Sequence, residues 1–277
     1  MNSVSLPSGP SGSPGRALLG VAAAGLLGLL MFSPTLLLHY QIQTPEAEAE
    51  EDTTPPIWPL PDDETALRKA QLINLLLPAI QANNRELLAL RAEAEAIHQR
   101  FRARRLTAQD FDWLVAQARR YRLEPPATPA TLTEDWFATL LRRIDIVPAS
   151  LALAQGAIES AWGTSRFAEE GNNYFGQWCF TPGCGMVPAR RPAGARYEVQ
   201  LFDTPDDAVR AYMLNLNSHP RYRHLRLLRE QARAQEKPIS GHTLAAGLEG
   251  YAEIGDEYIS RLRAVMRSND FRRFESF

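Results

Sequence analysis

The feature that most constrains the fold is an apolar helical segment with one acidic residue at its end. Its apolar positions recur at helical spacing: Leu151, Ala154, Ala157 and Ile158. This spacing predicts a buried helix over 153–160 that stops at Gly163, with Glu159 in its last turn. Burial beside Trp162 and the negative end of the helix dipole both disfavour the carboxylate and raise the pKa of Glu159. The segment therefore predicts a general acid, and an ion pair with Arg166 is the alternative.

A segment rich in aromatic and amide side chains follows this helix over 171–178. Aromatic faces stack on sugar rings, and Asn or Gln amides bond their hydroxyl and acetamido groups. A structural loop usually uses Gly and Asn without several exposed rings, so the segment predicts a sugar-binding platform. The candidate substrate-binding residues are Trp162, Asn173, Tyr174, Phe175, Gln177 and Trp178.

Three short motifs follow one another from the end of the helix. They are Glu-Ser-x-Trp-Gly at 159–163, Ser-x-x-Ala at 165–168 and Asn-x-Phe-Gly at 173–176. In this order they resemble the glucosaminidase (autolysin) family of cell-wall hydrolases. The run Gly-Gln-Trp-Cys-Phe-Thr-Pro-Gly-Cys-Gly at 176–185 is similar to the Bax-like branch of that family in Gram-negative bacteria. The resemblance covers 131–277 and is specific as a compound motif.

The resemblance implies a lysozyme-like helical domain, and local patterns agree with it. Tyr197, Val199 and Leu201 alternate with other residues, which predicts the return strand of a short hairpin whose outgoing half lies near 186–190. The run from Thr204 predicts a capped helix that includes 208–217. We therefore expect a mainly α (α+β) fold with a small β-hairpin flap over a groove.

The resemblance also implies catalytic roles. Glu159 would protonate the glycosidic oxygen, and Tyr251, in a Gly-Tyr-Ala motif, would border the cleft and take part in catalysis, with a helix-capping role as its alternative. The family's second acid usually lies on the flap, but the segment 187–194 contains none here. Glu198 is the nearest carboxylate and the candidate second acid, facing either the cleft or solvent. Without it, the 2-acetamido group of the substrate would act as the internal nucleophile.

Two C-terminal patterns indicate structural roles. Apolar residues at helical spacing over 258–266, which include Tyr258, predict a core-facing helix outside the site.

With a net charge of −2, the 277-residue chain has no general reason to bind nucleic acid. A group of arginines after His219 is expected to form a solvated helix face: Arg221, Arg223, Arg226, Arg229 and Arg233.

The N-terminal part predicts membrane attachment. Residues 1–16 are rich in Ser, Pro and Gly and are expected to be a short disordered N-terminus. Residues 17–38 form an uncharged apolar run of about the length that spans a bilayer. No clear small-x-small cleavage site appears at 33–36, which favours a retained signal-anchor over a cleaved signal peptide. With Arg16 inside, the remaining chain would lie in the periplasm, anchored to the inner membrane.

The segments after the anchor predict a linker and a helical region. Residues 39–63 are acidic and rich in proline, which predicts an extended linker. Residues 64–124 predict helices, interrupted at Pro78, with one helix over 108–121. Their apolar faces are expected to pack on the catalytic domain at 131–277, and dimerisation is the alternative.

Cys179 and Cys184 are the two cysteines of the chain. The turn between them can bring them together, and the predicted export favours a disulfide over two free thiols. The five histidines have no metal-ligand spacing to a Cys or carboxylate motif. We therefore expect neither a metal nor another cofactor.

These observations predict a membrane-anchored periplasmic endo-β-N-acetylglucosaminidase that hydrolyses peptidoglycan glycan strands. A lytic transglycosylase is the alternative enzyme, because it also uses one Glu on this architecture. An inactive peptidoglycan-binding adaptor is the alternative from another class, because the flap acid is missing.

Overall fold

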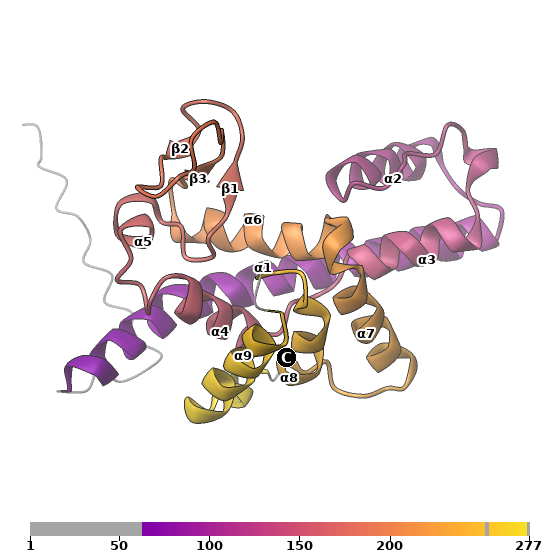
Figure 1. Ribbon diagram of the computed structural model, residues 1–277. Coiled ribbons are helices and arrows are strands. Elements are labelled where there is room, and N and C mark those ends of the chain that lie inside the picture. Colours follow the sequence, from indigo (N-terminus) through magenta and orange to yellow (C-terminus); the bar gives the residue numbers. More distant parts are fainter. Residues whose placement is uncertain (1–62, 253–254, 276–277) are drawn as a thin grey trace, which may run out of the picture. The chain divides into compact units, whose positions relative to one another are not determined.

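The computed structural model describes residues 63–252 and 255–275 (Figure 1). The predicted disordered N-terminus at 1–16, the signal-anchor at 17–38 and the linker up to residue 62 lie outside the described residues. Within the described ranges, no helix is both long enough and apolar enough to cross a membrane.

The described chain is mainly helical. The longer α-helices are α1 (Glu64–Arg102), α2 (Ala108–Arg120), α3 (Glu134–Arg143), α4 (Ala149–Glu159), α6 (Pro205–Ser218), α7 (Arg223–Ala234) and α9 (Asp256–Ser268). The shorter helices are α5 (Arg166–Gly171) and α8 (Gly241–Leu244), with the 3-10 turns η1 (Pro129–Thr131), η2 (Pro220–Tyr222), η3 (Ala245–Leu248) and η4 (Phe271–Phe274). The strands are β1 (Trp178–Cys179), β2 (Gly185–Met186) and β3 (Glu198–Gln200).

Side-chain caps explain where two of the predicted helices begin. The Thr107 hydroxyl accepts a hydrogen bond from the Asp110 amide at 3.1 Å, and the Asp110 carboxylate bonds the Thr107 amide, a capping box that starts α2. Thr204 caps α6 in the same way, by accepting from the Asp207 amide. Helices expected at 108–121, 208–217 and 258–266 correspond to α2, α6 and α9.

α1 is one continuous helix that passes through Pro78. The predicted interruption at this proline was wrong. A proline inside a helix costs about 3 kcal/mol, but Leu76, Leu77 and Ile80 around it are fully buried. α1 packs along α3, α4 and α6 (Figure 1), so its apolar face is covered by these helices. Burial on both sides of the proline therefore outweighs the local backbone preference.

The strands form a small antiparallel sheet in the order β1-β3-β2. Val199 in the central strand lies opposite Trp178 and Met186. The strand predicted around 197–201 is present, but its partner begins at Gly185, and β1 adds a third strand that the hairpin prediction lacked. A Cβ at Gly185 would lie 2.1 Å from the Val199 carbonyl oxygen, so a glycine is required at this close approach. Strands of two residues are too short to show an alternation pattern.

The arginine-rich helix α7 does not present a fully solvated face. Arg226 and Arg229 are only 3% and 1% exposed. Arg226 donates to the Leu216 carbonyl oxygen at 2.7 Å, and Arg229 donates to the Ile146 and Arg142 carbonyl oxygens at 2.6 and 3.0 Å. The two guanidinium groups thus bond carbonyls at the ends of α6 and α3. The predicted solvated face was wrong for these residues because they satisfy backbone groups of other helices.

Candidate active site

Glu159 is the last residue of α4, a helix whose preceding residues are almost all buried. After it the chain turns sharply, with Ala161, Trp162 and Gly163 at φ of 52°, 62° and 85°. The Trp162 amide donates to the Ala157 carbonyl oxygen at 2.8 Å, which closes the end of the helix. The left-handed turn therefore ends α4 at the acid and leaves its side chain half-buried in the domain.

The two oxygens of Glu159 have different surroundings. Oε1 accepts a hydrogen bond of 2.7 Å from the Tyr258 hydroxyl. Oε2 lies beside Gly176, where an added Cβ would be 3.4 Å from it. Burial raises the pKa of Glu159 above its usual value, against the opposing effect of the Tyr258 hydrogen bond. This is the direction that a general acid needs at neutral pH.

The alternative interpretation of Glu159 was an ion pair with Arg166. In the described part of the chain, Arg166 donates to the Val187 carbonyl oxygen at 3.4 Å and lies 4.0 Å from the Glu170 carboxylate. The Arg166 guanidinium is thus directed to α5 and the flap instead of to Glu159.

Tyr258 belongs to the site, and its interpretation as scaffold alone was wrong. Its ring is buried in the core, but its hydroxyl bonds Glu159. The same hydroxyl accepts from Gln155 Nε2 at 3.1 Å, and Gln155 Oε1 accepts from the Tyr212 hydroxyl at 2.6 Å. Helical periodicity indicates that Tyr258 faces the core. The remaining signal in the sequence was its phenol oxygen, because a buried Tyr hydroxyl needs a partner.

Tyr251 lies beside this group of phenols. Its ring stacks on Tyr258 with centroids 5.4 Å apart and planes 6° apart. Its hydroxyl donates to the Phe175 carbonyl oxygen at 2.8 Å. Tyr251 therefore holds the loop that carries Gly176 and supports the ring of Tyr258, and its hydroxyl donates to the loop instead of to Glu159.

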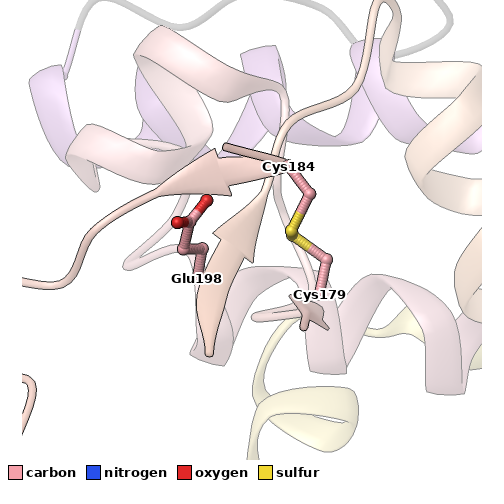
Figure 2. A group of neighbouring side chains, drawn as sticks. All are labelled: Cys179, Cys184 and Glu198. Carbon is pink, nitrogen blue, oxygen red and sulfur yellow. A yellow bond between two sulfur atoms is a disulfide. The ribbon is translucent and has the colours of Figure 1, made fainter. Parts of the chain in front are cut away.

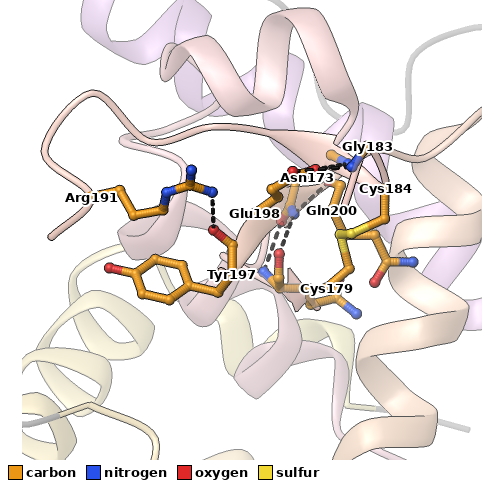
Figure 3. Close-up of a disulfide and its surroundings, with 10 residues drawn as sticks. Asn173, Cys179, Gly183, Cys184, Arg191, Tyr197, Glu198 and Gln200 are labelled. Carbon is orange, nitrogen blue, oxygen red and sulfur yellow. Dashed lines mark hydrogen bonds between the residues drawn. A yellow bond between two sulfur atoms is a disulfide. The ribbon is translucent and has the colours of Figure 1, made fainter. Parts of the chain in front are cut away.

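Most of the predicted sugar platform is buried. Tyr174, Phe175 and Asn173 are 7%, 1% and 1% exposed. Asn173 donates to the Gln177 and Gln200 carbonyl oxygens at 2.9 and 2.8 Å (Figure 3). These residues therefore shape the loop from within. The expectation of three exposed rings was wrong, because composition does not show which ring of a loop turns inward.

The other predicted platform residues differ in exposure. Gln177 is half-buried, with its amide against the backbone of α6. Trp162 is half-buried, with Lys69 Nζ 5.1 Å above its ring. Trp178 is 55% exposed and stacks on Tyr197 with centroids 4.4 Å apart and planes 9° apart. We call Trp178 and Tyr197 the flap aromatic pair, and it offers a sugar ring an open face.

Cys179 and Cys184 form the predicted disulfide at the edge of the flap (Figures 2 and 3). Glu198 lies next to it, and its carboxylate accepts from the Gly183 and Gly185 amides at 3.1 and 2.9 Å. These amides lower the pKa of Glu198 below its usual value. The side chain is only 7% exposed, so the predicted choice between cleft and solvent missed a third environment, the amides of the disulfide loop.

This same group has the spacing of metal ligands. Among the described residues, Cys179, Cys184 and Glu198 offer ligand atoms that lie within 4.8 Å of one another (Figure 2). The two sulfurs are joined to each other, so they are not available as thiolate ligands.

A separate hollow of about 340 Å³ lies between α1, α3 and α7 and does not include Glu159. Its charged side chains are largely paired within the protein. Arg142 pairs with Glu230 at 2.8 Å, and Arg233 donates to Asp145 at 2.6 Å through Nε. The hollow is therefore lined by a structural network of ion pairs. Its Glu230 and Asp145 carboxylates are paired with arginines, unlike the Glu159 carboxyl group at the end of α4.

Comparisons with known proteins cover the part of the chain that holds this site. The family model described as "Mannosyl-glycoprotein endo-beta-N-acetylglucosaminidase" matches residues 134–271, which include Glu159, Gly176 and Tyr258. This chain carries a Bax-like glucosaminidase-family domain. The resemblance seen in the motifs is thus confirmed for this part of the chain, and the family supports a glycosidase-type enzyme in general.

Protein bax of Escherichia coli (strain K12) is 34% identical to this chain over 131 residues, which are 47% of this chain and 46% of that protein. The match therefore spans about half the length of that relative. No solved structure matches the chain significantly. The whole of α1 precedes the glucosaminidase domain, yet it packs directly on α4.

Proposed function

We propose that this chain is an endo-β-N-acetylglucosaminidase that hydrolyses peptidoglycan glycan strands, with Glu159 as the general acid. The observation that carries the proposal is the half-buried Glu159 carboxyl group in the glucosaminidase domain, whose pKa burial raises. A carboxylic acid that keeps its proton at neutral pH can protonate the glycosidic oxygen as the bond breaks.

The flap aromatic pair supports a glycan as the substrate. Trp178 follows Gly176 by two residues, so the backbone of the exposed indole starts within about 7 Å of the turn that borders Glu159. In the binding mode that we propose, one pyranose ring stacks on Trp178 while another sugar of the same strand lies beside the acid.

The surroundings of Glu198 favour assistance by the substrate. Its carboxylate is bound by two loop amides and is mostly buried, which leaves little of it for an attack on the sugar. In the pathway we propose, the carbonyl oxygen of the 2-acetamido group attacks the anomeric carbon while Glu159 protonates the leaving oxygen. Water then attacks the anomeric carbon and opens the cyclic intermediate. Glu159, now a carboxylate, accepts a proton from this water.

A site with Glu159 as its single available carboxyl group among the described residues also fits one alternative enzyme, a lytic transglycosylase, because that reaction needs only one carboxyl group. Digestion of purified sacculi followed by mass spectrometry of the products separates the two reactions. We expect reducing N-acetylglucosamine ends, released by the wild type and not by Glu159→Gln. Anhydro-muramyl ends in place of reducing ends would show that the enzyme is a lytic transglycosylase. Binding to sacculi without release of any product would favour the adaptor function.

We also propose that the chain is anchored in the inner membrane with its catalytic domain in the periplasm. This rests on the apolar run at 17–38 and the lack of a clear cleavage site after it. The full-length protein should fractionate with the inner membrane and keep its N-terminus. A soluble mature form that starts after Leu38 would contradict the anchor.

A further inference from the structure

Glu159 is the end point of a directional chain of hydrogen bonds. Tyr212 donates to Gln155 Oε1 at 2.6 Å, Gln155 Nε2 donates to the Tyr258 oxygen at 3.1 Å, and Tyr258 donates to Glu159 Oε1 at 2.7 Å. Each hydroxyl has a single proton to donate. Because the Gln155 amide occupies a lone pair of the Tyr258 oxygen, the phenol proton points to Glu159.

Three elements fix this chain in place. Gln155 and Glu159 lie one turn apart on α4, so their side chains share one face of the helix. Tyr212 comes from α6 and Tyr258 from α9, and both rings are nearly inaccessible, at 1% and 2% exposure. Gln155 is fully buried. A buried network in which every member has a partner holds its geometry rigidly.

We infer that Tyr258 is the positioning residue of the acid: its hydroxyl occupies Glu159 Oε1, so the transferable proton resides on Oε2, which faces Gly176. The inference rests on the proposed role of Glu159 as general acid. The oxygen that accepts the phenol proton is favoured as the carbonyl oxygen of the acid, since a carbonyl oxygen is the stronger acceptor, so the second oxygen carries the acidic hydrogen. Gly176 leaves that oxygen accessible, because any side chain there would place a Cβ 3.4 Å from it.

The titratable side chains around Glu159 are uncharged at physiological pH. Within the described residues, the titratable groups that face Glu159 are phenols, those of Tyr212 on α6, Tyr222 in η2, Tyr251 before α9 and Tyr258 on α9. Burial raises the pKa of each of these hydroxyls, so all four stay neutral at physiological pH. A change at Tyr258 therefore acts on Glu159 through one hydrogen bond and not through a change in charge.

The first test removes the donor and leaves the ring. In Tyr258→Phe, kcat should fall by about tenfold to a hundredfold because the acid loses its fixed orientation. The titration of Glu159 should also move to higher pH, since the lost bond favoured the carboxylate. NMR of the full-length protein with 13C-labelled glutamate carboxyls follows this titration directly, and the Glu159 signal is the one absent in Glu159→Gln.

Tyr251→Phe is the matched control, because it removes the neighbouring phenol whose hydrogen bond goes to the Phe175 carbonyl oxygen. Its Glu159 titration should stay in place even if its rate falls. If Tyr258→Phe does not fold, Gln155→Met removes the group that orients the Tyr258 hydroxyl, and the Glu159 titration should again move to higher pH. An unchanged or lower midpoint in the folded variant overturns the inference.

The second test covers the oxygen that carries the proton. Gly176→Ala should lower kcat at least tenfold, because the added methyl contacts Oε2. Gly194→Ala controls for backbone strain, since Gly194 also has a positive φ, of 83°, and an added Cβ there meets nothing within 4 Å. A folded Gly176→Ala protein with kcat within twofold of the wild type would place the proton elsewhere.

The two proposals fail separately. If Glu159→Gln keeps the wild-type rate, the proposed function fails, and the NMR titration still reports whether Tyr258 donates to Glu159. If the titration does not respond to Tyr258→Phe while Glu159→Gln is inactive, the function stands and the positioning role is overturned.

Discussion

Glu159→Gln tests the central residue of the site with little change in shape. Gln keeps the size of Glu, its Oε1 can still accept from Tyr258, and its amide takes the place of the oxygen beside Gly176. What disappears is the acidic proton. General acid catalysis contributes at least about a hundredfold, and a hundredfold loss corresponds to about 2.7 kcal/mol of transition-state stabilisation. We therefore expect kcat on purified peptidoglycan to fall at least that far.

The same variant makes a prediction for stability, with a definite sign. Burial raises the folded-state pKa of Glu159, so between the unfolded and folded values the folded chain binds one more proton than the unfolded chain. In this window the stability of the wild type falls as the pH rises. Gln does not titrate. The stability of Glu159→Gln relative to the wild type should therefore rise with pH across this window and then stay level.

Urea unfolding followed by circular dichroism over a range of pH values measures this difference, and product release from sacculi measures the rate. Glu169→Gln is the matched control, because Glu169 is an exposed acid on the nearby helix α5 and should change neither quantity. A Glu159→Gln protein that hydrolyses glycan near the wild-type rate would refute the role as general acid. A loss of stability relative to the wild type that grows with pH would refute the cause given for the pKa.

Three further predictions follow from other parts of the molecule. Asp145→Asn should lower the free energy of unfolding by about 3–5 kcal/mol at pH 7, because it leaves the buried Arg229 without its carboxylate 3.7 Å away. The lowered pKa of Asp145 means that this deficit, measured by urea unfolding, should shrink as the pH falls through that pKa. Trp178→Ala should raise KM for glycan oligomers about two- to tenfold, because it removes an exposed stacking face, and the lost stacking on Tyr197 should lower the free energy of unfolding by only about 0.5–1.5 kcal/mol. Cys179 and Cys184 should react with an alkylating reagent in the unfolded protein only after reduction, and mass spectrometry that finds earlier labelling would contradict the disulfide.

Local sequence was enough to place Glu159 at the end of a buried helix. Glu159 ends an apolar helical run, and the turn residues after it follow within four positions. The caps at Thr107 and Thr204 also depend on neighbours in the chain, and so does the disulfide between Cys179 and Cys184. These features involve contacts over short separations, which residue types and spacing describe well.

Local sequence did not show which side chains of the loop at 171–178 are exposed. Tyr174, Phe175 and Trp178 have similar chemistry, yet the first two are buried and the third is 55% exposed. Phe175 stacks on Tyr212 of α6, with centroids 4.1 Å apart. No rule of local spacing selects which ring of a short irregular loop packs on a distant helix. The same holds for Glu198, whose face of the strand is covered by the disulfide loop.

By itself, the sequence determined that Glu159 ends a buried helix, which family its motifs belong to and which segments form helices, because these depend on residues a few positions apart. Only the tertiary structure decided what surrounds the acid. Tyr258 lies 99 residues from Glu159, and its helix pattern shows an apolar face without showing which polar atom that face will meet. The physical reason is that hydrogen-bond partners and burial are set by the packing of α4, α6 and α9 together, which periodicity along any one of them does not contain.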